Sequence, residues 1–271
     1  MEIKLKVYIS ADIEGITGTT HFDETDIKKP DYNEFREQMT AEVAAACKGA
    51  TEAGATEIWI KDAHDTGRNI LASKLPENTK LVRGWSGHPL SMAQELDESF
   101  DAMMMIGYHA KAGSPGSPLA HTMTGRFMHM KINDRYASEF LIHAYAAASC
   151  NVPVVLVTGD HALSREVKAI NSNIETVSVK EGIGESTISI HPNRATQLIH
   201  AGAKSALNSD IGKCLIPLPD TFSIEMRFKK HSHAYRNSFY PGAKIIDDFT
   251  VVFETDVYFE FLRFLLFVTG I

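Results

Sequence analysis

The chain has few cysteines, and the three that it has lie far apart in the sequence. Cys47, Cys150 and Cys214 form no Cys-x-x-Cys pair, which argues against a disulfide framework and against a zinc site built from cysteine. The first two fall in alanine-rich helical patterns, where a cysteine is usually a small buried residue. We therefore expect free thiols and a cytoplasmic protein.

The chain also lacks an excess of positive charge and a long apolar run. It has 27 Lys and Arg against 34 Asp and Glu, a formal net charge of −7 and no basic stripe, so we expect no nucleic-acid partner. The most apolar stretch, residues 259–268, is too short to cross a bilayer and contains Arg263. We expect a terminal helix there, packed on its own domain or on a neighbouring subunit, and no membrane partner.

Motifs of several enzyme classes are missing as well. The chain has no Gly-x-Ser-x-Gly elbow of the kind that serine hydrolases use, and no phosphate-binding P-loop. Gly182-Ile183-Gly184 lacks both the third glycine of a dinucleotide loop and a matching strand, so we give it no weight.

Four short apolar runs are present, and each of them ends in acidic or histidine residues. The runs span 6–10, 57–60, 103–106 and 153–157, and the polar residues that follow them are Asp12, Glu14, Asp62, His64, His109 and Asp160. Unbroken apolar runs of this length are typical of a parallel sheet that is buried on both faces. Because parallel strands all point the same way, we expect these side chains to meet in one crevice at the carboxyl edge of the sheet.

Helical patterns between the runs complete an α/β fold. Residues 33–53 and 140–149 have the apolar spacing of amphipathic helices, which predicts strand, helix, strand units with parallel pairing. Residues 71–75 and 90–100 supply further helical pattern. The sequence therefore predicts a three-layer core around a mostly parallel sheet.

The last third of the chain changes character. Residues 222–228 and 250–254 alternate between apolar and polar side chains, and a helix is expected around 193–207. We predict two domains: residues 1–170 form the α/β metal-binding catalytic core, and residues 171–271 form a smaller α+β portion that takes part in assembly.

Two acids and two histidines at the strand ends favour a metal site. Asp12 and Glu14 lie two residues apart, so in extended backbone their carboxylates leave the same face and repel unless a cation or a proton intervenes. His64 and His109 each follow another strand, and imidazole together with carboxylate suits zinc. Each of these residues taken alone is more often a structural residue than a metal ligand, but the four together indicate a metal site. Asp62 is either a further ligand or a partner that orients an imidazole.

A third histidine in the site has two possible roles. His121 lies beyond the Gly- and Pro-rich segment 111–118, and His129 and His143 are nearby competitors. Such a residue could be a metal ligand or a proton carrier, and its spacing in the sequence does not decide between them.

The motifs, taken as a set, resemble a known family. Ser10-Ala11-Asp12-Ile13-Glu14-Gly15, Asp62-Ala63-His64, Gly107-Tyr108-His109-Ala110, His121-Thr122-Met123 and Glu139 recur in this order and at similar spacing in the zinc-dependent D-aminopeptidases of the bacterial dipeptide-utilisation type. The resemblance covers nearly the whole chain. It implies a two-zinc site with one bridging carboxylate and with five ligands, which are Asp12, Glu14, His64, His109 and Glu139. It also implies that His121 is catalytic and is no metal ligand, and that the subunits form ring-stacked decamers whose active sites face an inner channel.

The chain departs from the family's pattern near two of these motifs. Lys61 precedes Asp62, Ala63 replaces a small polar residue, and Ser138 stands before Glu139 where the family usually has glycine. None of these departures removes a ligand. They bear on the local backbone at Glu139 and on the substrate preference.

The implied reaction is metal-assisted hydrolysis of a peptide. Two metals would lower the pKa of a shared water, which attacks the amide carbonyl, and His121 would stabilise the oxyanion or pass a proton to the leaving amine. Two alternatives stay open at this point. One is another metallohydrolase on the same site, an amidohydrolase or a phosphoesterase, and the other is a protein in which the metals only staple strand ends.

Overall fold

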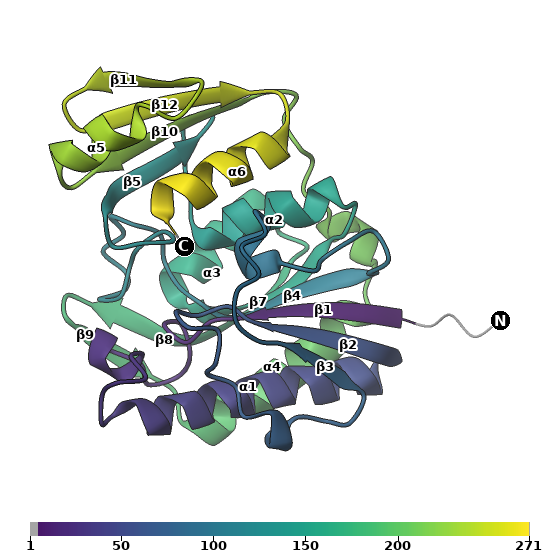
Figure 1. The fold of residues 1–271 in the computed structure, drawn as a ribbon. Helices are drawn as coiled ribbons and strands as arrows, with labels where there is room; N and C mark the ends of the chain where they lie inside the picture. The colour runs from purple at the N-terminus through teal and green to yellow at the C-terminus, as the bar shows by residue number, and fades with distance from the viewer. Residues whose placement is uncertain (1–4, 271) are drawn as a thin grey trace.

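The computed structural model describes residues 5–270, which form two β-sheets with helices around and between them (Figure 1). Within these residues the larger sheet has seven strands in the order β3-β2-β1-β4-β7-β8-β9. Neighbouring strands are parallel except β9, which runs antiparallel to β8. The strands are β1 (Leu5–Ala11), β2 (Ala55–Asp62), β3 (Thr79–Val82), β4 (Ala102–Tyr108), β7 (Val154–Asp160), β8 (Glu175–Ile183) and β9 (Ser186–Ser189). The mostly parallel core is therefore as predicted.

Helices cover both faces of the larger sheet and produce the three predicted layers. In Figure 1, α1 (Tyr32–Glu52) and α4 (Pro192–Leu207) pack together below the sheet, whereas α2 (Glu139–Ser149) and α3 (His161–Ile170) lie above it. From Met39 to Ala50 every residue of α1 except Ala41 and Lys48 is buried, so this half of the helix is enclosed by the sheet and α4.

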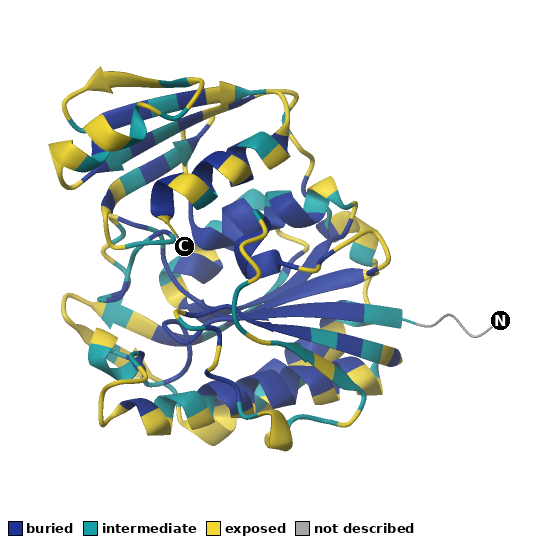
Figure 2. Ribbon diagram, in the orientation of Figure 1, coloured by how far each residue is buried: buried dark blue, intermediate teal, exposed yellow. Residues whose placement is uncertain are grey.

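The central strands have no polar face. Every residue of β4 and β7 is buried, and Figure 2 shows dark blue along the middle of the sheet. The unbroken apolar runs in the sequence predict this arrangement, because a sheet with helices on both faces needs apolar side chains on both. Polar residues that follow these strands are consequently held against a closed core.

The second sheet is antiparallel and has the order β11-β12-β10-β5-β6 within the described residues. Its strands are β5 (Phe127–Ile132), β6 (Arg135–Tyr136), β10 (Phe222–Phe228), β11 (Ala243–Asp247) and β12 (Thr250–Thr255). The predicted terminal helix is α6 (Tyr258–Thr269), which packs between this sheet and α2, while α5 (His231–Asn237) packs on the sheet alone (Figure 1). None of the helices in residues 5–270 has the length and apolarity needed to cross a membrane.

The division between the two sheets differs from the predicted boundary near residue 170. β8, β9 and α4 complete the larger sheet and its lower layer, although they come after this point in the chain. β5 and β6 come before it and join the second sheet. Pairing between segments that are distant in the sequence decides which sheet a strand joins, and local composition does not reveal this pairing.

The helical patterns predicted for 71–75 and 90–100 were wrong. These residues form loops that contain only the short 3₁₀ turns Ala72–Lys74 and Ser91–Ala93. Ser91 has a φ of 49° and Glu95 a φ of 70°, and this left-handed backbone is incompatible with a continuous α-helix. The apolar side chains of 90–100 instead cover the core from a loop.

Candidate metal centre

The acids and histidines that follow the strands meet at the carboxyl edge of the larger sheet. Asp12 comes directly after β1, His64 two residues after β2, and His109 directly after β4. Glu139 is the first residue of α2, where the positive end of the helix dipole favours a carboxylate. The loop that carries Glu14 passes close to the end of β4.

Two glycines permit this close approach. A Cβ at Gly15 would collide with the backbone carbonyls of Gly107 and Tyr108, and a Cβ at Gly107 would collide with the carbonyl of Asp12. Gly107 also has a φ of 72°, a left-handed backbone conformation that residues other than glycine rarely adopt. The backbones of the segments that carry Asp12 and His109 are therefore in direct contact.

One half of the centre is formed around His64. The Nδ1 atom of His64 lies 3.2 Å from Asp12 Oδ1 and 2.7 Å from Glu14 Oε2. Glu14 Oε2 is nevertheless a buried oxygen without a hydrogen-bond partner among the described residues. An imidazole nitrogen and a carboxylate oxygen that face each other in this way are suited to sharing a cation. We call Asp12, Glu14 and His64 the His64 half.

The other half is formed around His109. The Nε2 atom of His109 lies 3.6 Å from Asp12 Oδ2 and 3.4 Å from Glu139 Oε2, and it also lacks a hydrogen-bond partner in the described part of the chain. We call Asp12, His109 and Glu139 the His109 half. Asp12 faces one histidine with each of its two oxygens and is common to both halves.

The histidines are held in the tautomers that a metal requires. His64 places its Nε2 atom 3.1 Å from the carbonyl of Thr25, and His109 places its Nδ1 atom 2.9 Å from the carbonyl of Ala110. A carbonyl only accepts, so each of these nitrogens carries the proton. In the neutral imidazole the opposite nitrogen, which faces the carboxylates, then offers its lone pair to a cation.

The charges of the site are strongly coupled because it is buried. Burial raises the pKa of Asp12 well above its usual value, and the neighbouring charge of Glu14 raises it further. Burial alone would raise the pKa of Glu139 too, but the nearby His109 outweighs that effect and lowers it to about 2. Burial alone would lower the pKa of His109, but the charges of Glu139 and Asp12 raise it to about 10. Three buried carboxylates thus draw positive charge into the site, which a divalent cation also supplies.

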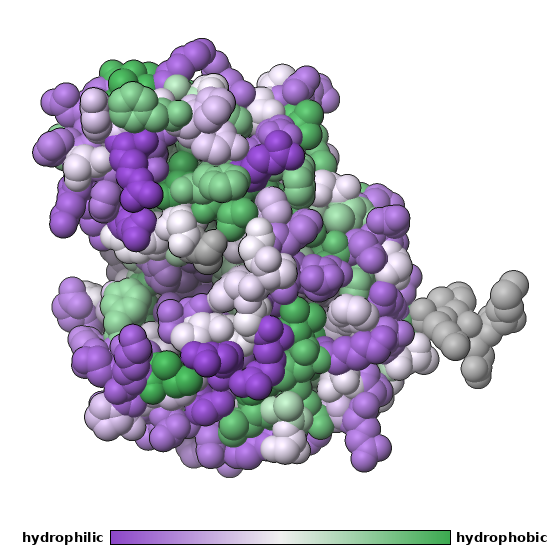
Figure 3. Space-filling model, viewed as in Figure 1, coloured by the Kyte–Doolittle hydropathy of each residue, from purple (hydrophilic) through white to green (hydrophobic). Residues whose placement is uncertain are grey.

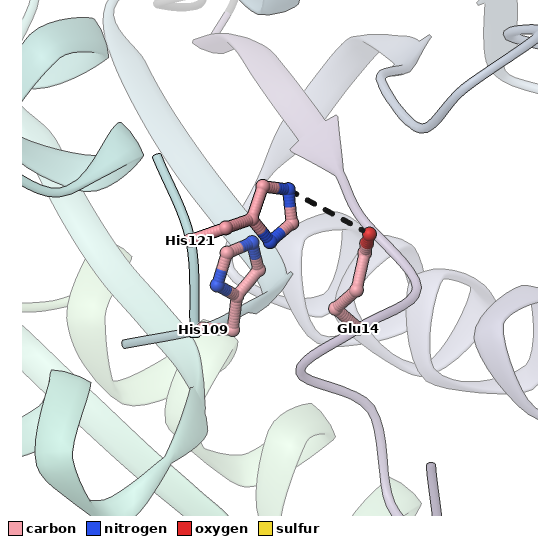
Figure 4. A group of neighbouring side chains, drawn as sticks. All are labelled: Glu14, His109 and His121. Carbon is pink, nitrogen blue, oxygen red and sulfur yellow. Dashed lines mark ion pairs between the residues drawn. The ribbon is translucent and has the colours of Figure 1, made fainter. Parts of the chain in front are cut away.

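His121 lies beside both halves. Its Nε2 atom is 3.9 Å from Glu14 Oε1 and 3.6 Å from Glu139 Oε1, and its ring stacks on that of His109 with 4.3 Å between centroids (Figure 4). Its Nδ1 atom donates to the carbonyl of Leu119 at 2.9 Å, which again leaves Nε2 with the lone pair. Glu14, His109 and His121 form a third group of atoms close enough to hold an ion, so the geometry allows both roles of His121.

A cavity of about 430 Å³ opens onto the centre. Besides the acids and histidines, its walls contain Ala63 and Met123 from the motifs and four residues that the sequence analysis did not single out, namely Asp65, Trp85, Ser91 and Met92. A larger groove of about 780 Å³ lies between α1 and α4, but none of the residues of the two halves lines it. The cavity at the centre is therefore the one in which chemistry is expected.

Other candidates from the sequence lie outside the site. Asp62 accepts hydrogen bonds from the backbone of Asn69 and Ile70 and so holds the loop after His64. Asp160 caps α3 and accepts from the backbone of Ala110.

The two competing histidines are also engaged elsewhere. His129 lies on β5 and pairs with Glu225 at 3.0 Å. His143 is buried in α2 and donates from its Nδ1 atom to the carbonyl of Glu139 at 2.7 Å, so it supports the first turn of the helix that carries Glu139.

Trp85 is the functional candidate that the sequence analysis missed. It lies in a Gly-Trp-Ser-Gly loop segment. An isolated aromatic residue between glycines is the feature of the sequence that could have pointed to a role in the site. Its indole nitrogen donates to the carbonyl of Asp65 at 2.6 Å, and the ammonium of Lys61 lies 3.8 Å from its ring centroid. These contacts fix the tryptophan in the cavity wall.

Three comparisons with known proteins agree with this geometry. The family Peptidase_M55, described as D-aminopeptidase, matches residues 5–267. A D-aminopeptidase of Bacillus subtilis (strain 168) is 33% identical over 250 residues, which span 92% of this chain and 90% of that protein. The structure of the Zn-dependent D-aminopeptidase DppA from Bacillus subtilis, described as a self-compartmentalizing protease, matches with a TM-score of 0.92 and 31% identity over 98% of this chain and 97% of that chain. The chain belongs to the D-aminopeptidase family of peptide hydrolases.

Proposed function

We propose that this chain is a zinc-dependent aminopeptidase that removes N-terminal D-residues from short peptides with two zinc ions per subunit. The ligands are the five residues of the two halves, with Asp12 as the bridging carboxylate, and His121 is the catalytic proton carrier. The activity follows the family to which the chain belongs, and zinc follows the donor set of carboxylates and imidazoles.

The position of Asp12 between the two histidines is the main observation that supports this proposal. Its two oxygens face His64 and His109 respectively, and each histidine also faces a second carboxylate. A site that only staples strand ends is closed by protein ligands, whereas a catalytic site keeps an open position. The cavity beside these residues provides such a position.

When bound, the two zinc ions supply an activated water and an electrophile for the scissile carbonyl. His121 faces the same space with its Nε2 atom, which can accept the proton of the water and pass it to the leaving amine. Trp85, Met92 and Met123 give the cavity an apolar wall for a substrate side chain, and Asp65 gives it an acidic residue that suits the free amine.

The cavity favours a peptide over a phosphate ester. Phosphate recognition calls for Arg or Lys in the cavity wall, and the described residues that line it include neither. The two lysines nearest the motifs are engaged elsewhere: Lys61 donates to the carbonyl of Gly84, and Lys111 pairs with Glu166.

Metal analysis combined with peptide hydrolysis tests the proposal. We expect two equivalents of zinc, cleavage of short peptides with an N-terminal D-residue in preference to the L-forms, and loss of cleavage after chelation with the fold intact. One equivalent of metal without turnover of any peptide would contradict the proposal, and phosphoesterase activity would favour the alternative.

Assembly into a ring-stacked decamer is part of the same proposal, as is the assignment of residues 171–271 to that assembly. Support comes from the relative described as self-compartmentalizing and from large apolar side chains left exposed in this portion, among them Tyr235, Ile246, Phe239 and Phe267. Figure 3 shows green apolar surface over the second sheet and α6. The three unpaired cysteines fit the cytoplasm as the compartment.

A further inference from the structure

The loop from Asp12 to Thr19 carries two of the ligands of the His64 half. It leaves the sheet at the end of β1 and returns toward the surface through Gly18. Loop residues have no ladder of hydrogen bonds to fix them, so the position of the Glu14 carboxylate depends on what holds this backbone. Backbone hydrogen bonds from the nitrogens of Asp12 and Gly15 to the carbonyls of Ile106 and Gly107 hold the start of the loop. Two buried charged side chains from other elements hold its backbone from Glu14 to Thr19.

The first of these is Lys180 on β8. Its ammonium donates to the backbone carbonyl of Glu14 and to that of Thr19, each at 2.5 Å. Lys180 is only 3% exposed, and no ion pair joins it to a carboxylate within residues 5–270. One nitrogen atom thereby joins the third residue of the loop, Glu14, to its last residue, Thr19.

The second is Glu42 on α1, which is fully buried. Its Oε1 atom accepts from the backbone nitrogen of Thr17 at 2.9 Å, in the middle of the same loop. A cation from the sheet and a carboxylate from the lower helix layer therefore hold three successive points of the loop backbone.

A buried ammonium group lowers the stability of a fold. Moving a charge out of water costs free energy that only close, well-placed partners offset, and lysine is rarely buried without a carboxylate partner. A methionine of similar length would fill the same space without this cost. The position of Lys180 is therefore better explained by what it holds than by the stability of the fold.

We infer that Lys180 is a positioning residue that fixes the Glu14 carboxylate through the backbone of Glu14 and so sets the affinity of the His64 half for its metal ion. This inference rests on the proposed two-metal function. It assigns Lys180 to one half only, because its contacts are to the loop that carries Glu14 and to neither His109 nor Glu139.

Metal affinity measured without any assay of turnover tests the inference. Metal-free wild-type protein, Lys180→Met and Lys180→Arg would be titrated with zinc in competition with a chromophoric chelator. For Lys180→Met we expect one of the two equivalents to bind about 10–100-fold more weakly, as is typical when a group supporting a ligand is removed, with the other unchanged. Lys180→Arg keeps the charge and the donors and is expected to recover part of the affinity.

Lys168→Met is the matched control. Lys168 also donates to two backbone carbonyls, those of Ser172 and Ile174, but it is exposed and makes no contact with the site. Both equivalents should bind to this variant as they bind to wild type.

The outcomes separate this inference from the proposed function. Wild-type affinity at both equivalents in Lys180→Met would overturn the inference, and so would an equal loss at both. If Lys180→Met does not fold, Lys180→Arg decides in the same way, through weakening at one equivalent or at none. Wild-type protein that binds fewer than two equivalents would overturn the proposed function, and this inference with it.

Discussion

The two halves of the candidate metal centre are built in different ways. The His64 half takes its residues from the ends of the adjacent strands β1 and β2, and its nitrogen-to-oxygen contacts are 2.7 and 3.2 Å. The His109 half joins a strand end to the first residue of a helix, and its contacts are 3.4 and 3.6 Å. Neighbouring strands bring the residues of the first half together. In the second half the distance between His109 and Glu139 depends on how α2 packs against the sheet.

The supports of the two halves have opposite charge. Lys180 stands behind the loop of Glu14, and Glu166 on α3 stands behind the His109 half. One oxygen of Glu166 accepts from Ser138 at 2.7 Å and the other from Lys111. Glu166 therefore ties the residue that caps α2 to the segment that follows His109. The comparison teaches that each half has its own remote support, so the halves can be perturbed separately.

Substitution at the shared carboxylate is expected to have the largest effect. Asp12→Asn removes charge from both halves, and we expect loss of both zinc equivalents and of peptide hydrolysis, measured by elemental analysis and a peptide assay. His64→Ala is the matched variant, because it should remove one equivalent only. Retention of one tightly bound ion by Asp12→Asn would show that this residue does not bridge.

Substitution of His121 is expected to come next. His121→Ala removes the proposed proton carrier but no ligand, so both zinc equivalents should remain while turnover falls by about 10²–10⁴-fold. Steady-state kinetics measure the turnover, and metal analysis of the same preparation measures the zinc content. Loss of one equivalent would instead identify His121 as a ligand, the role that the third group of atoms allows.

Weakening the support of the His109 half should have a smaller effect. Glu166→Gln removes the charge that holds Lys111 and Ser138, and we expect one zinc equivalent to bind roughly 10-fold more weakly in the competition titration. Glu181→Gln, at an exposed position on β8, is the control. Combined with Lys180→Met, the losses should add, since the two supports act on different halves. Strong non-additivity would show that the halves behave as one unit.

The smallest expected effect is on stability at alkaline pH. Burial lowers the pKa of Lys61 to about 8, against a usual value of 10.5. Between these pH values the unfolded chain binds more protons at Lys61 than the folded chain does, so Lys61 contributes a rise of the free energy of unfolding with pH. His109, whose pKa is raised to about 10, contributes a fall as pH rises toward that value, so the share of Lys61 is read from the difference between wild type and a variant.

Urea unfolding of metal-free protein at several pH values measures this dependence. Across this window the free energy of unfolding of Lys61→Met should rise less, or fall more, than that of wild type, while the share from Lys180, whose burial also lowers its pKa to about 8, remains. An identical pH dependence in the variant and in wild type would mean that the pKa of Lys61 is the same in the folded and unfolded states.

The strand ends of the site could be predicted because their position follows from local sequence. An apolar run fixes where a buried parallel strand stops, and Asp12, His64 and His109 come within two residues of such a stop. The supports could not be predicted in this way. Lys180 and Glu14 are 166 residues apart and meet only because β8 joins the same sheet, so no local pattern signals their contact.

The loops also explain where sequence patterns mislead. Residues 90–100 have apolar side chains at helical spacing, but they serve as a cover for the core and supply Met92 to the cavity wall. The second sheet draws β5 from the first half of the chain and pairs it with β10 from the last third, and the local sequence of β5 carries little signal of that distant partner.

Anomalous diffraction at the zinc edge from crystals of the zinc-loaded protein tests the central claim most directly. The two halves predict two peaks about 3.5–4 Å apart, with Asp12 between them and with His64 and His109 each bound to one ion. A single peak, or two peaks without Asp12 between them, would contradict the account.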